Sequence, residues 1–452
     1  MKIVIIGDGK VGYKLAKQLS EENYDIVLID NNEGKLKEAI NRLDIICITG
    51  DGASVEIQKE ADVAHADLVI ACASTDEFNM VACLLAKRIG AKHTIARVRN
   101  PIYYQQIDIL KEDLHLSMAV NPELAVAGEI ARVLLFPEAS KVDTFVKGRM
   151  ELVEFQIPNP SKIAGMTLAE IYQNFQIKVL VCAVKRGAKV LIPDGDFEVK
   201  AGDKLHVAAT HREMELFFKS LGNPKNKVHK VIICGGGRVG FYLAKQLCAL
   251  GMQIKIIERD TKKCEELCEA LPKATIINGD AADHDLLVEE GIGKADALIA
   301  LTGMDEENII MGLFAKTQGV SKIIAKVNED TRAQMVQGLG IDSIVSAKSA
   351  TADVIMGYVR AKQNSLKSAN VEALYYLLDG KVEALEFAIK EDAKYANIPL
   401  KNLPTKPDHL IACIGRDRRI IIPNGEDCIQ VGDSVVVVTT TRKIQDIEEI
   451  FL

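Results

Sequence analysis

Three glycines near the start of the chain have the spacing of a phosphate-binding turn. Gly7, Gly9 and Gly12 follow the apolar run IVII and open a helix-like segment. The first glycine allows a tight turn, the second lets a pyrophosphate approach the backbone, and the third lets the helix pack close to the strand. The anion would bind the free N–H groups at the positive end of that helix. The residues predicted to cradle it are Gly7, Asp8, Gly9, Lys10, Val11 and Gly12.

A carboxylate stands where a ribose would lie. Asp30 ends the next apolar run, 18 residues after Gly12. It can accept hydrogen bonds from both ribose hydroxyls and would repel a 2′-phosphate. NAD(H), or another plain adenosine ligand, is therefore favoured over NADP(H) at this first site. A degenerate fold with an empty pocket is the alternative.

The same pattern returns 228 positions later, with Glu258 as the acid. Arg238 replaces Lys10, either as a cation for a more highly charged phosphate group or as a solvated surface residue. Arg259 could tolerate a ribose phosphate, so the ligand of this second site stays open between NAD(H) and ATP or ADP. The loop residues are Gly235, Gly236, Gly237, Arg238, Val239 and Gly240.

Further candidates follow other predicted strands, whose carboxyl ends form the ligand edge of an open parallel sheet. In the first half they are Asp51, Ala73, Ser74, Thr75 and Arg97, and in the second half Asp280, Thr302 and Lys326. Glu77 and Asn79, with Glu306 and Asn308, begin the next helix in each half. They could contact the ligand or simply cap and complement the helix N-terminus.

The elements that must position these residues are strands alternating with helices. Five short apolar runs in each half, joined by helical segments, are typical of a parallel sheet covered on both faces. GDGAS at 50–54 returns as GDAAD at 279–283, and TDEFN at 75–79 returns as MDEEN at 304–308. The fold class predicted is α/β, with two tandem doubly wound Rossmann domains, each followed by a small α+β domain.

Four domains are expected. Residues 1–140 and 226–365 form the Rossmann domains, each ending in an amphipathic helix at 122–136 and 350–362. These helices could pack in a core or cross to another subunit. Residues 141–225 and 366–452 form the small domains, rich in turn signals and each ending in a short helix. The polar stretch 222–230 is the expected linker between halves.

Composition narrows the possible partners and compartment. The net charge is −7 without a dense basic block, which argues against a nucleic-acid partner. The sequence has no evident signal peptide and no apolar run of about 18 residues that would cross a membrane. The ten cysteines lie mostly in apolar segments, as free cytoplasmic thiols do. Cys264 and Cys268 lack a second pair at ligand spacing, so no metal site is predicted.

A dehydrogenase would need a substrate site and a group that moves a proton near the nicotinamide. The eight histidines do not match between the repeats, and no HxxEH, GxSxG, CxxC or Walker A motif occurs. Two ligand-binding sheets tied to small domains favour a device that turns ligand occupancy into conformational change. The alternatives are an NAD-dependent oxidoreductase with its substrate site between modules and a sensor with a partner unrelated to transport.

The motifs resemble those of the TrkA family, the peripheral subunits of Trk potassium uptake built from two tandem RCK/KTN units. The resemblance covers the whole chain. It rests on GDGKVG, Asp30, GDGAS, STDEFN and ARVRNP, and then on GGGRVG, Glu258, GDAAD, MDEEN and AKVNED. It implies a cytosolic, non-catalytic regulator at the inner face of the plasma membrane. Such a regulator assembles as a dimer or a tetrameric ring under a potassium-translocating subunit of the TrkH, TrkG or KtrB kind.

The resemblance also implies ligands and residues. Family members bind NAD(H) and adenine nucleotides, which suggests NAD(H) at the first site and NAD(H) or ATP/ADP at the second. Carried over by position, the binding residues are Gly7 to Val11, Asp30, Ala73, Ser74 and Arg97, then Gly235 to Val239, Glu258, Thr302 and Lys326. The second half has Asn328 in place of Arg99. The helices expected from Asp76 and from Asp305 serve either as assembly surfaces or as core.

Overall fold

The computed structural model describes residues 1–146, 148–221, 227–335, 339–366, 371–378, 381–390, 393–417, 419–441, 444 and 446–452. Part of the predicted linker (222–226) lies outside these residues, as does the start of the second small domain (367–370). The chain divides into two compact units. One comprises Met1–Ala127 with Val345–Met356, and the other comprises Gly128–Ile344 with Gly357–Leu452.

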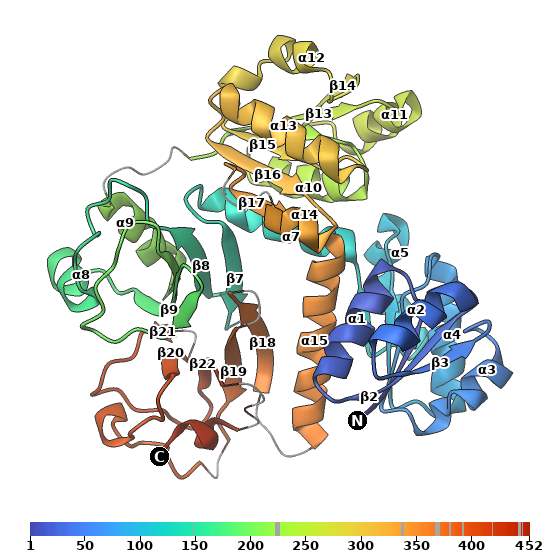
Figure 1. Ribbon diagram of the computed structural model, residues 1–452, viewed down its shortest axis with the longest axis horizontal. Coiled ribbons are helices and arrows are strands. Elements are labelled where there is room, and N and C mark those ends of the chain that lie inside the picture. The colour runs from blue at the N-terminus through green and yellow to red at the C-terminus, as the bar shows by residue number, and fades with distance from the viewer. Residues whose placement is uncertain are drawn as a thin grey trace. The chain divides into compact units, whose positions relative to one another are not determined.

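The first unit contains a six-stranded parallel sheet in the order β3-β2-β1-β4-β5-β6 (Figure 1). Its strands are β1 (Lys2–Ile6), β2 (Asp25–Asp30), β3 (Ile46–Thr49), β4 (Leu68–Ala71), β5 (His93–Arg97) and β6 (Met118–Val120). The short sixth strand was not predicted, since its three residues carry no periodic signal. The order reverses beside β1, which places the glycine loop at the switch point of a doubly wound sheet.

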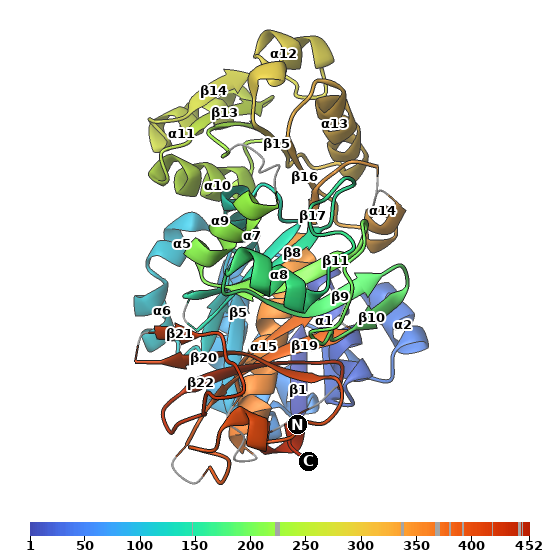
Figure 2. The same ribbon diagram turned by 90° about the vertical axis from the view of Figure 1, so that its left-hand side faces the viewer.

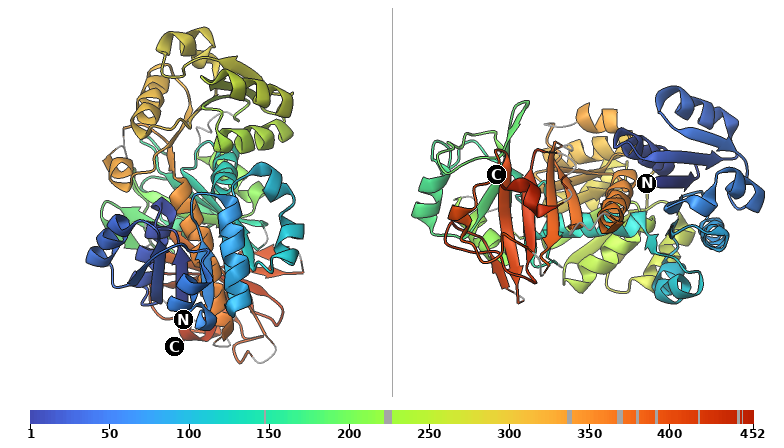
Figure 3. Two further views of the ribbon diagram at one scale, coloured as in Figure 1. Left: turned by 90° about the vertical axis from the view of Figure 1, so that its right-hand side faces the viewer. Right: turned by 90° about the horizontal axis from the view of Figure 1, so that it is seen from below.

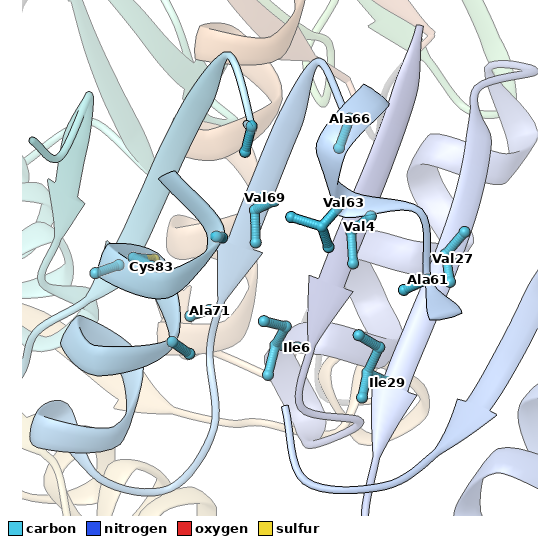
Figure 4. Close-up of a cluster of buried hydrophobic side chains, with 14 of the residues drawn as sticks. Val4, Ile6, Val27, Ile29, Ala61, Val63, Ala66, Val69, Ala71 and Cys83 are labelled. Atoms are coloured by element: carbon cyan, nitrogen blue, oxygen red, sulfur yellow. The ribbon is translucent and has the colours of Figure 1, made fainter. Parts of the chain in front are cut away.

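Helices cover both faces of this sheet, which explains why its central strands are apolar throughout. They are α1 (Lys10–Glu21), α2 (Glu33–Arg42), α3 (Val55–Glu60), α4 (Asp76–Ile89), α5 (Pro101–Gln105), α6 (Ile107–Asp113) and the 3₁₀ turn η1 (Val63–His65). On one face, Val4, Ile6 and Val69 pack against Val63 of η1 and Cys83 of α4 (Figure 4). This core fixes the strand ends from which the loops project.

The second Rossmann domain repeats the first. Its sheet has the order β14-β13-β12-β15-β16-β17, and Figure 2 shows α10 and α11 on one side of it and α13 on the other. The strands are β12 (Lys230–Cys234), β13 (Gln253–Glu258), β14 (Thr275–Asn278), β15 (Ala297–Ala300), β16 (Lys322–Lys326) and β17 (Ser343–Val345). The helices are α10 (Arg238–Ala249), α11 (Thr261–Ala270), α12 (His284–Glu289), η2 (Ile292–Lys294), α13 (Asp305–Thr317) and α14 (Asp330–Met335).

Each small domain is built on a five-stranded antiparallel sheet, so the predicted fold class is confirmed. The first has the order β10-β9-β11-β8-β7 and the second β18-β19-β22-β20-β21, seen in orange and red on the right of Figure 3. The strands are β7 (Lys141–Phe145), β8 (Met150–Gln156), β9 (Leu180–Arg186), β10 (Lys189–Leu191), β11 (Lys204–Ala209), β18 (Val371–Leu377), β19 (Val382–Ala388), β20 (His409–Arg416), β21 (Arg419–Ile421) and β22 (Ser434–Thr439).

Short helices complete the small domains: α8 (Leu168–Phe175), α9 (His211–Ser220), η3 (Leu400–Asn402) and η4 (Ile447–Ile450). The first small domain ends in the expected helix, α9. At the end of the second, the described residues form only the 3₁₀ turn η4, while Arg442, Lys443 and Gln445 lie outside the described residues. The predicted amphipathic segments are α7 (Pro122–Leu135) and α15 (Ala347–Leu366).

The two small domains share one hydrophobic core. It joins Phe145, Val146 and Leu152 of the first domain to Leu377 and Val436 of the second. The Val146 backbone N–H also donates to Glu386 Oε2 at 3.1 Å. Because buried side chains from both sheets belong to the same core, the two small domains pack as one unit.

A fully buried lysine ties the second Rossmann sheet to the chain just beyond α7. Lys322 of β16 has no exposed surface, and its ammonium donates to the carbonyls of Pro137 and Ala139. Nearby, Ser343 Oγ donates to the Ser140 carbonyl at 2.8 Å. These bonds satisfy carbonyls that follow the end of a helix.

Candidate functional site

Both glycine turns have the backbone that a diphosphate cradle requires. Gly7 and Gly235 lie at φ +105° and +108°, in the left-handed region that favours glycine. A Cβ on Gly7 would lie 2.8 Å from the Ala73 nitrogen, and a Cβ on Gly12 would overlap the Gly7 carbonyl. Gly9 is different, because an added Cβ there would meet no atom of the described residues within 4 Å. The open side of the turn is therefore at the second glycine.

The open side faces the start of a helix in both halves. Gly9 and Gly237 are the N-cap residues of α1 and α10, and neither helix has a side-chain hydrogen bond capping it among the described residues. The first N–H groups of such helices attract anions. Lys10 and Arg238 begin these helices and are exposed, where they can add positive charge.

The acid of each half is fixed by the backbone on both sides. Asp30 Oδ2 accepts the Asp8 N–H at 2.6 Å, and Oδ1 accepts the Asn32 N–H at 2.8 Å. Glu258 does the same 228 positions later. Its Oε2 accepts the Gly236 N–H at 2.8 Å and its Oε1 accepts the Asp260 N–H at 3.0 Å. A carboxylate oxygen can accept more than one hydrogen bond, so each acid is oriented and can still accept ribose hydroxyls.

The ends of β4 and β5 are joined by one buried asparagine. Asn79 Oδ1 accepts the Ala73 N–H at 2.8 Å, and its Nδ2 donates to the carbonyls of Ala73 at 3.2 Å and Arg97 at 3.0 Å. Asn308 makes the same bonds to Thr302 and Lys326. The sequence predicted that Asn79 contacts the ligand or caps the helix N-terminus. The bridge is a third role, in which the asparagine positions the loops after β4 and β5.

A cation lies at the end of β5 and β16. The Arg97 guanidinium donates through Nη2 to the Ala73 carbonyl, and burial lowers the pKa of Arg97. Its Nε is buried and lacks a hydrogen-bond partner among the described residues. Lys326 Nζ donates to the Leu301 carbonyl at 3.1 Å. Each therefore reaches the loop after the neighbouring strand. A place near a phosphate, or near a carboxylate such as Asp51, stays a prediction for both cations.

The other predicted residues are placed less decisively. Ser74 and Thr75 are exposed in the loop before α4, and Thr302 Oγ1 donates to Asn308 Oδ1 at 2.9 Å. Asp51 and Asp280 each accept the N–H two residues ahead, from Ala53 and Ala282. Val11, Gly12, Val239 and Gly240 are buried in the first turns of α1 and α10. Each aspartate thus shapes the turn that follows the third strand of its own sheet.

Two buried aspartates of the site were missed in the sequence. Asp76 Oδ2 accepts the N–H groups of Arg99 and Asn100 at 2.9 and 2.7 Å. Asp305 Oδ2 accepts those of Asn328 and Glu329 at 2.8 and 3.0 Å. The repeated aspartate in TDEFN and MDEEN was a signal that could have found them. They hold the loop that follows β5 or β16.

The difference at Arg99 has a local compensation. Arg99 Nε donates to the buried Glu123 Oε1 at 2.6 Å. After the sixth strand the shift between the halves is 225, so the second half has Asn328 in place of Arg99 and Lys348 in place of Glu123. Losing Arg99 therefore leaves no buried carboxylate behind.

No group of three or more potential metal ligands occurs among the described side chains. Cys264 is buried and its thiol donates to the Glu258 carbonyl at 3.3 Å, whereas Cys268 is exposed. Within the same residues, no helix combines the length and apolarity needed to cross a membrane.

These features define a tandem Rossmann protein with two loops of the dinucleotide-binding type. The TrkA-N domain model matches residues 3–122 and 231–347, and the TrkA-C domain model matches residues 152–222 and 384–452. A Trk system potassium uptake protein TrkA homolog from Archaeoglobus fulgidus is 32% identical over 453 residues, covering 100% of both chains. The chain belongs to the TrkA family.

Solved structures share the fold at low identity. The GsuK channel bound to NAD aligns with a TM-score of 0.64 and 18% identity, covering 97% of this chain and 77% of that one. GsuK bound to ADP aligns with a TM-score of 0.50 and 16% identity, covering 80% and 69%. RCK architecture is therefore common to this chain and to a channel.

Proposed function

We propose that this chain is a nucleotide-binding regulatory subunit that gates a membrane potassium transporter by ligand-dependent conformational change. The observation that carries the proposal is the pair of equivalent sites, each with an open glycine turn at an uncapped helix and an acid held by two backbone N–H groups. The relative from Archaeoglobus fulgidus is named for potassium uptake, which supports the choice of partner.

NAD(H) is the ligand proposed for the first site, and NAD(H) or ATP/ADP for the second. The titles of the GsuK structures with NAD and with ADP support these two ligand classes. When bound, the diphosphate would lie on the N–H groups of α1 or α10, and the ribose hydroxyls would donate to Asp30 or Glu258. Arg97 and Lys326 would supply positive charge near the phosphates.

The proposed assembly is a dimer or a tetrameric ring on the inner face of the plasma membrane, attached to a potassium-translocating subunit. A ligand shifts such a device only if it binds two conformations with different affinity. The two sites of each chain therefore allow two ligands, or one ligand twice, to bias the same gate.

Calorimetric titration with NADH, NAD, ATP and ADP tests the sites. We expect Asp30→Ala to abolish binding at the first site and Glu258→Ala at the second, while the double variant binds none of the four. Potassium uptake by cells carrying wild type or the double variant then tests gating. Equal uptake would refute the regulatory role, and NADH oxidation with turnover on a small substrate would favour the oxidoreductase alternative.

A further inference from the structure

The two nucleotide-type loops differ at one buried pair of positions. In the second half, a Cβ added to Gly236 would lie 2.5 Å from Leu267 Cδ1 and 3.2 Å from Glu258 Cβ. The corresponding residues of the first half, 228 positions earlier, are Asp8 and Ala39. A leucine side chain thus fills a space in the second half where the first half has a small residue and a carboxylate.

Asp8 is an unusual residue for this place. Its exposed fraction is 6%, and its Oδ1 is buried without a hydrogen-bond partner among the described residues. Charged and titratable groups face it from four segments of the first Rossmann domain: Asp30 of β2, Lys35 and Glu38 of α2, Cys47 of β3 and Cys72 after β4. For an ionised carboxylate, a buried oxygen without a hydrogen bond is unfavourable.

The surroundings disfavour two negative charges. Burial, and then the neighbouring Asp30, raise the pKa of Asp8, although Lys35 acts against them. Burial raises the pKa of Cys47 to about 11 and that of Cys72 to about 12, so both thiols are neutral near pH 7. A buried carboxyl group beside a second negative charge favours its protonated form.

A bound nucleotide would add to this effect. It would cover the loop that carries Asp8 and bring the negative charge of its diphosphate next to Asp8 and Asp30. Both changes favour the protonated form of Asp8 over its ionised form. The second loop, with Gly236 and Leu267 in these places, has one carboxylate there and no equivalent pair.

We propose that nucleotide binding at the first site is coupled to proton uptake by Asp8, and that binding at the second site lacks this coupling. Asp8 then gives the first site a response to acidity as well as to nucleotide, which the second site lacks. This inference rests on the proposed function, since it requires that the first loop binds nucleotide.

The test uses NAD and the full-length chain with one site silenced. In a Glu258→Ala background, binding at the first site is titrated between about pH 5.5 and 8, in buffers of different ionisation enthalpy. We expect affinity to fall as pH rises, by at most about tenfold per pH unit, with net proton uptake on binding. In this background, giving positions 8 and 39 the residues of the second half, Asp8→Gly with Ala39→Leu, should remove the pH dependence while NAD still binds.

The reciprocal exchange is the matched control. Gly236→Asp with Leu267→Ala, in an Asp30→Ala background, should confer proton uptake on the second site. Thermal unfolding of every variant identifies any that fails to fold, and either exchange alone suffices to decide. NAD binding with equal pH dependence before and after the exchange would overturn the inference and leave the proposed function intact. Absence of NAD binding at the first site at every pH would overturn both.

Discussion

The Arg186 guanidinium and the Asp203 carboxylate form a two-point ion pair in the first small domain. Nε donates to Oδ1 at 2.7 Å and Nη2 to Oδ2 at 2.6 Å. Arg416 and Asp433 repeat it in the second small domain, at 2.8 and 2.7 Å. In both cases the aspartate is almost fully buried. The two small domains therefore share this ion pair, just as the two Rossmann domains share their glycine turns and acids.

Removing the arginine of such a pair leaves a buried carboxylate without its charged donor. We therefore expect Arg186→Leu to lower the free energy of unfolding by about 2–3 kcal/mol, less than for a fully buried pair because the arginine is partly exposed. Urea denaturation measures the change. Exchanging the exposed Lys189 for leucine on the adjacent strand is the control, and an equal effect there would contradict the assignment.

Acid should weaken the first small domain through Asp203. Burial alone would raise the pKa of Asp203, but the Arg186 guanidinium and the Lys200 N–H outweigh it and hold that pKa below its usual range. A carboxyl whose pKa is lower in the folded chain stabilises it above the unfolded pKa and loses this as pH falls through the folded value. Thermal unfolding from roughly pH 7 to 2 should thus show a shallower acid decline in Asp203→Asn than in wild type. An unchanged slope would exclude this carboxyl as a contributor.

The two kinds of glycine in the turn should separate binding from folding. At Gly9 an added Cβ meets no atom within 4 Å in the part of the chain that the structure describes, and its φ of −84° suits any residue. Gly9→Ala should therefore leave stability within about 1 kcal/mol while weakening NAD binding, since the methyl group takes the space of the diphosphate. Gly12→Ala should destabilise the first Rossmann domain, because its Cβ would overlap the Gly7 carbonyl. Calorimetry measures NAD binding by both variants, and thermal unfolding measures their stability. If both variants bound NAD as tightly as wild type, the proposed diphosphate cradle would be contradicted.

Lys322 should matter for stability despite its charge. Lys322→Met leaves two carbonyls, those of Pro137 and Ala139, without their donor. We expect a loss of about 2–3 kcal/mol in urea denaturation. His93 is the corresponding residue of the first half and is only half-buried, so His93→Met should cost less than about 1 kcal/mol. A reversed order would show that the lysine contacts are not stabilising.

Much of the fold could be predicted from the periodic apolar pattern of the sequence and from its internal repeat. Glycine spacing, buried apolar runs and the 228-residue recurrence predicted two doubly wound sheets, because each of these signals is local in sequence. The sixth strands escaped, since Met118–Val120 and Ser343–Val345 are held by pairing with β5 and β16 rather than by their own pattern. Local propensity cannot detect an edge strand that short.

Predictions of the site were uneven for a similar reason. Asp30 and Glu258 stand at a fixed distance from a glycine motif, which made them candidates without any structure. The bridge made by Asn79, and the neighbourhood of Asp8 and Ala39, depend on which side chains meet across loops. Sequence spacing places Asn79 at a helix start but does not reveal that its amide reaches the end of β5.

The common core of the two small domains has a consequence for duplication itself. Two separate copies of one half could form such a core only by meeting in solution, so their pairing would depend on concentration. Joined in one chain, the partners are present at an effective concentration on the order of millimolar whatever the expression level. The fused chain thus makes this pairing independent of dilution, and its two halves are free to diverge in what they bind.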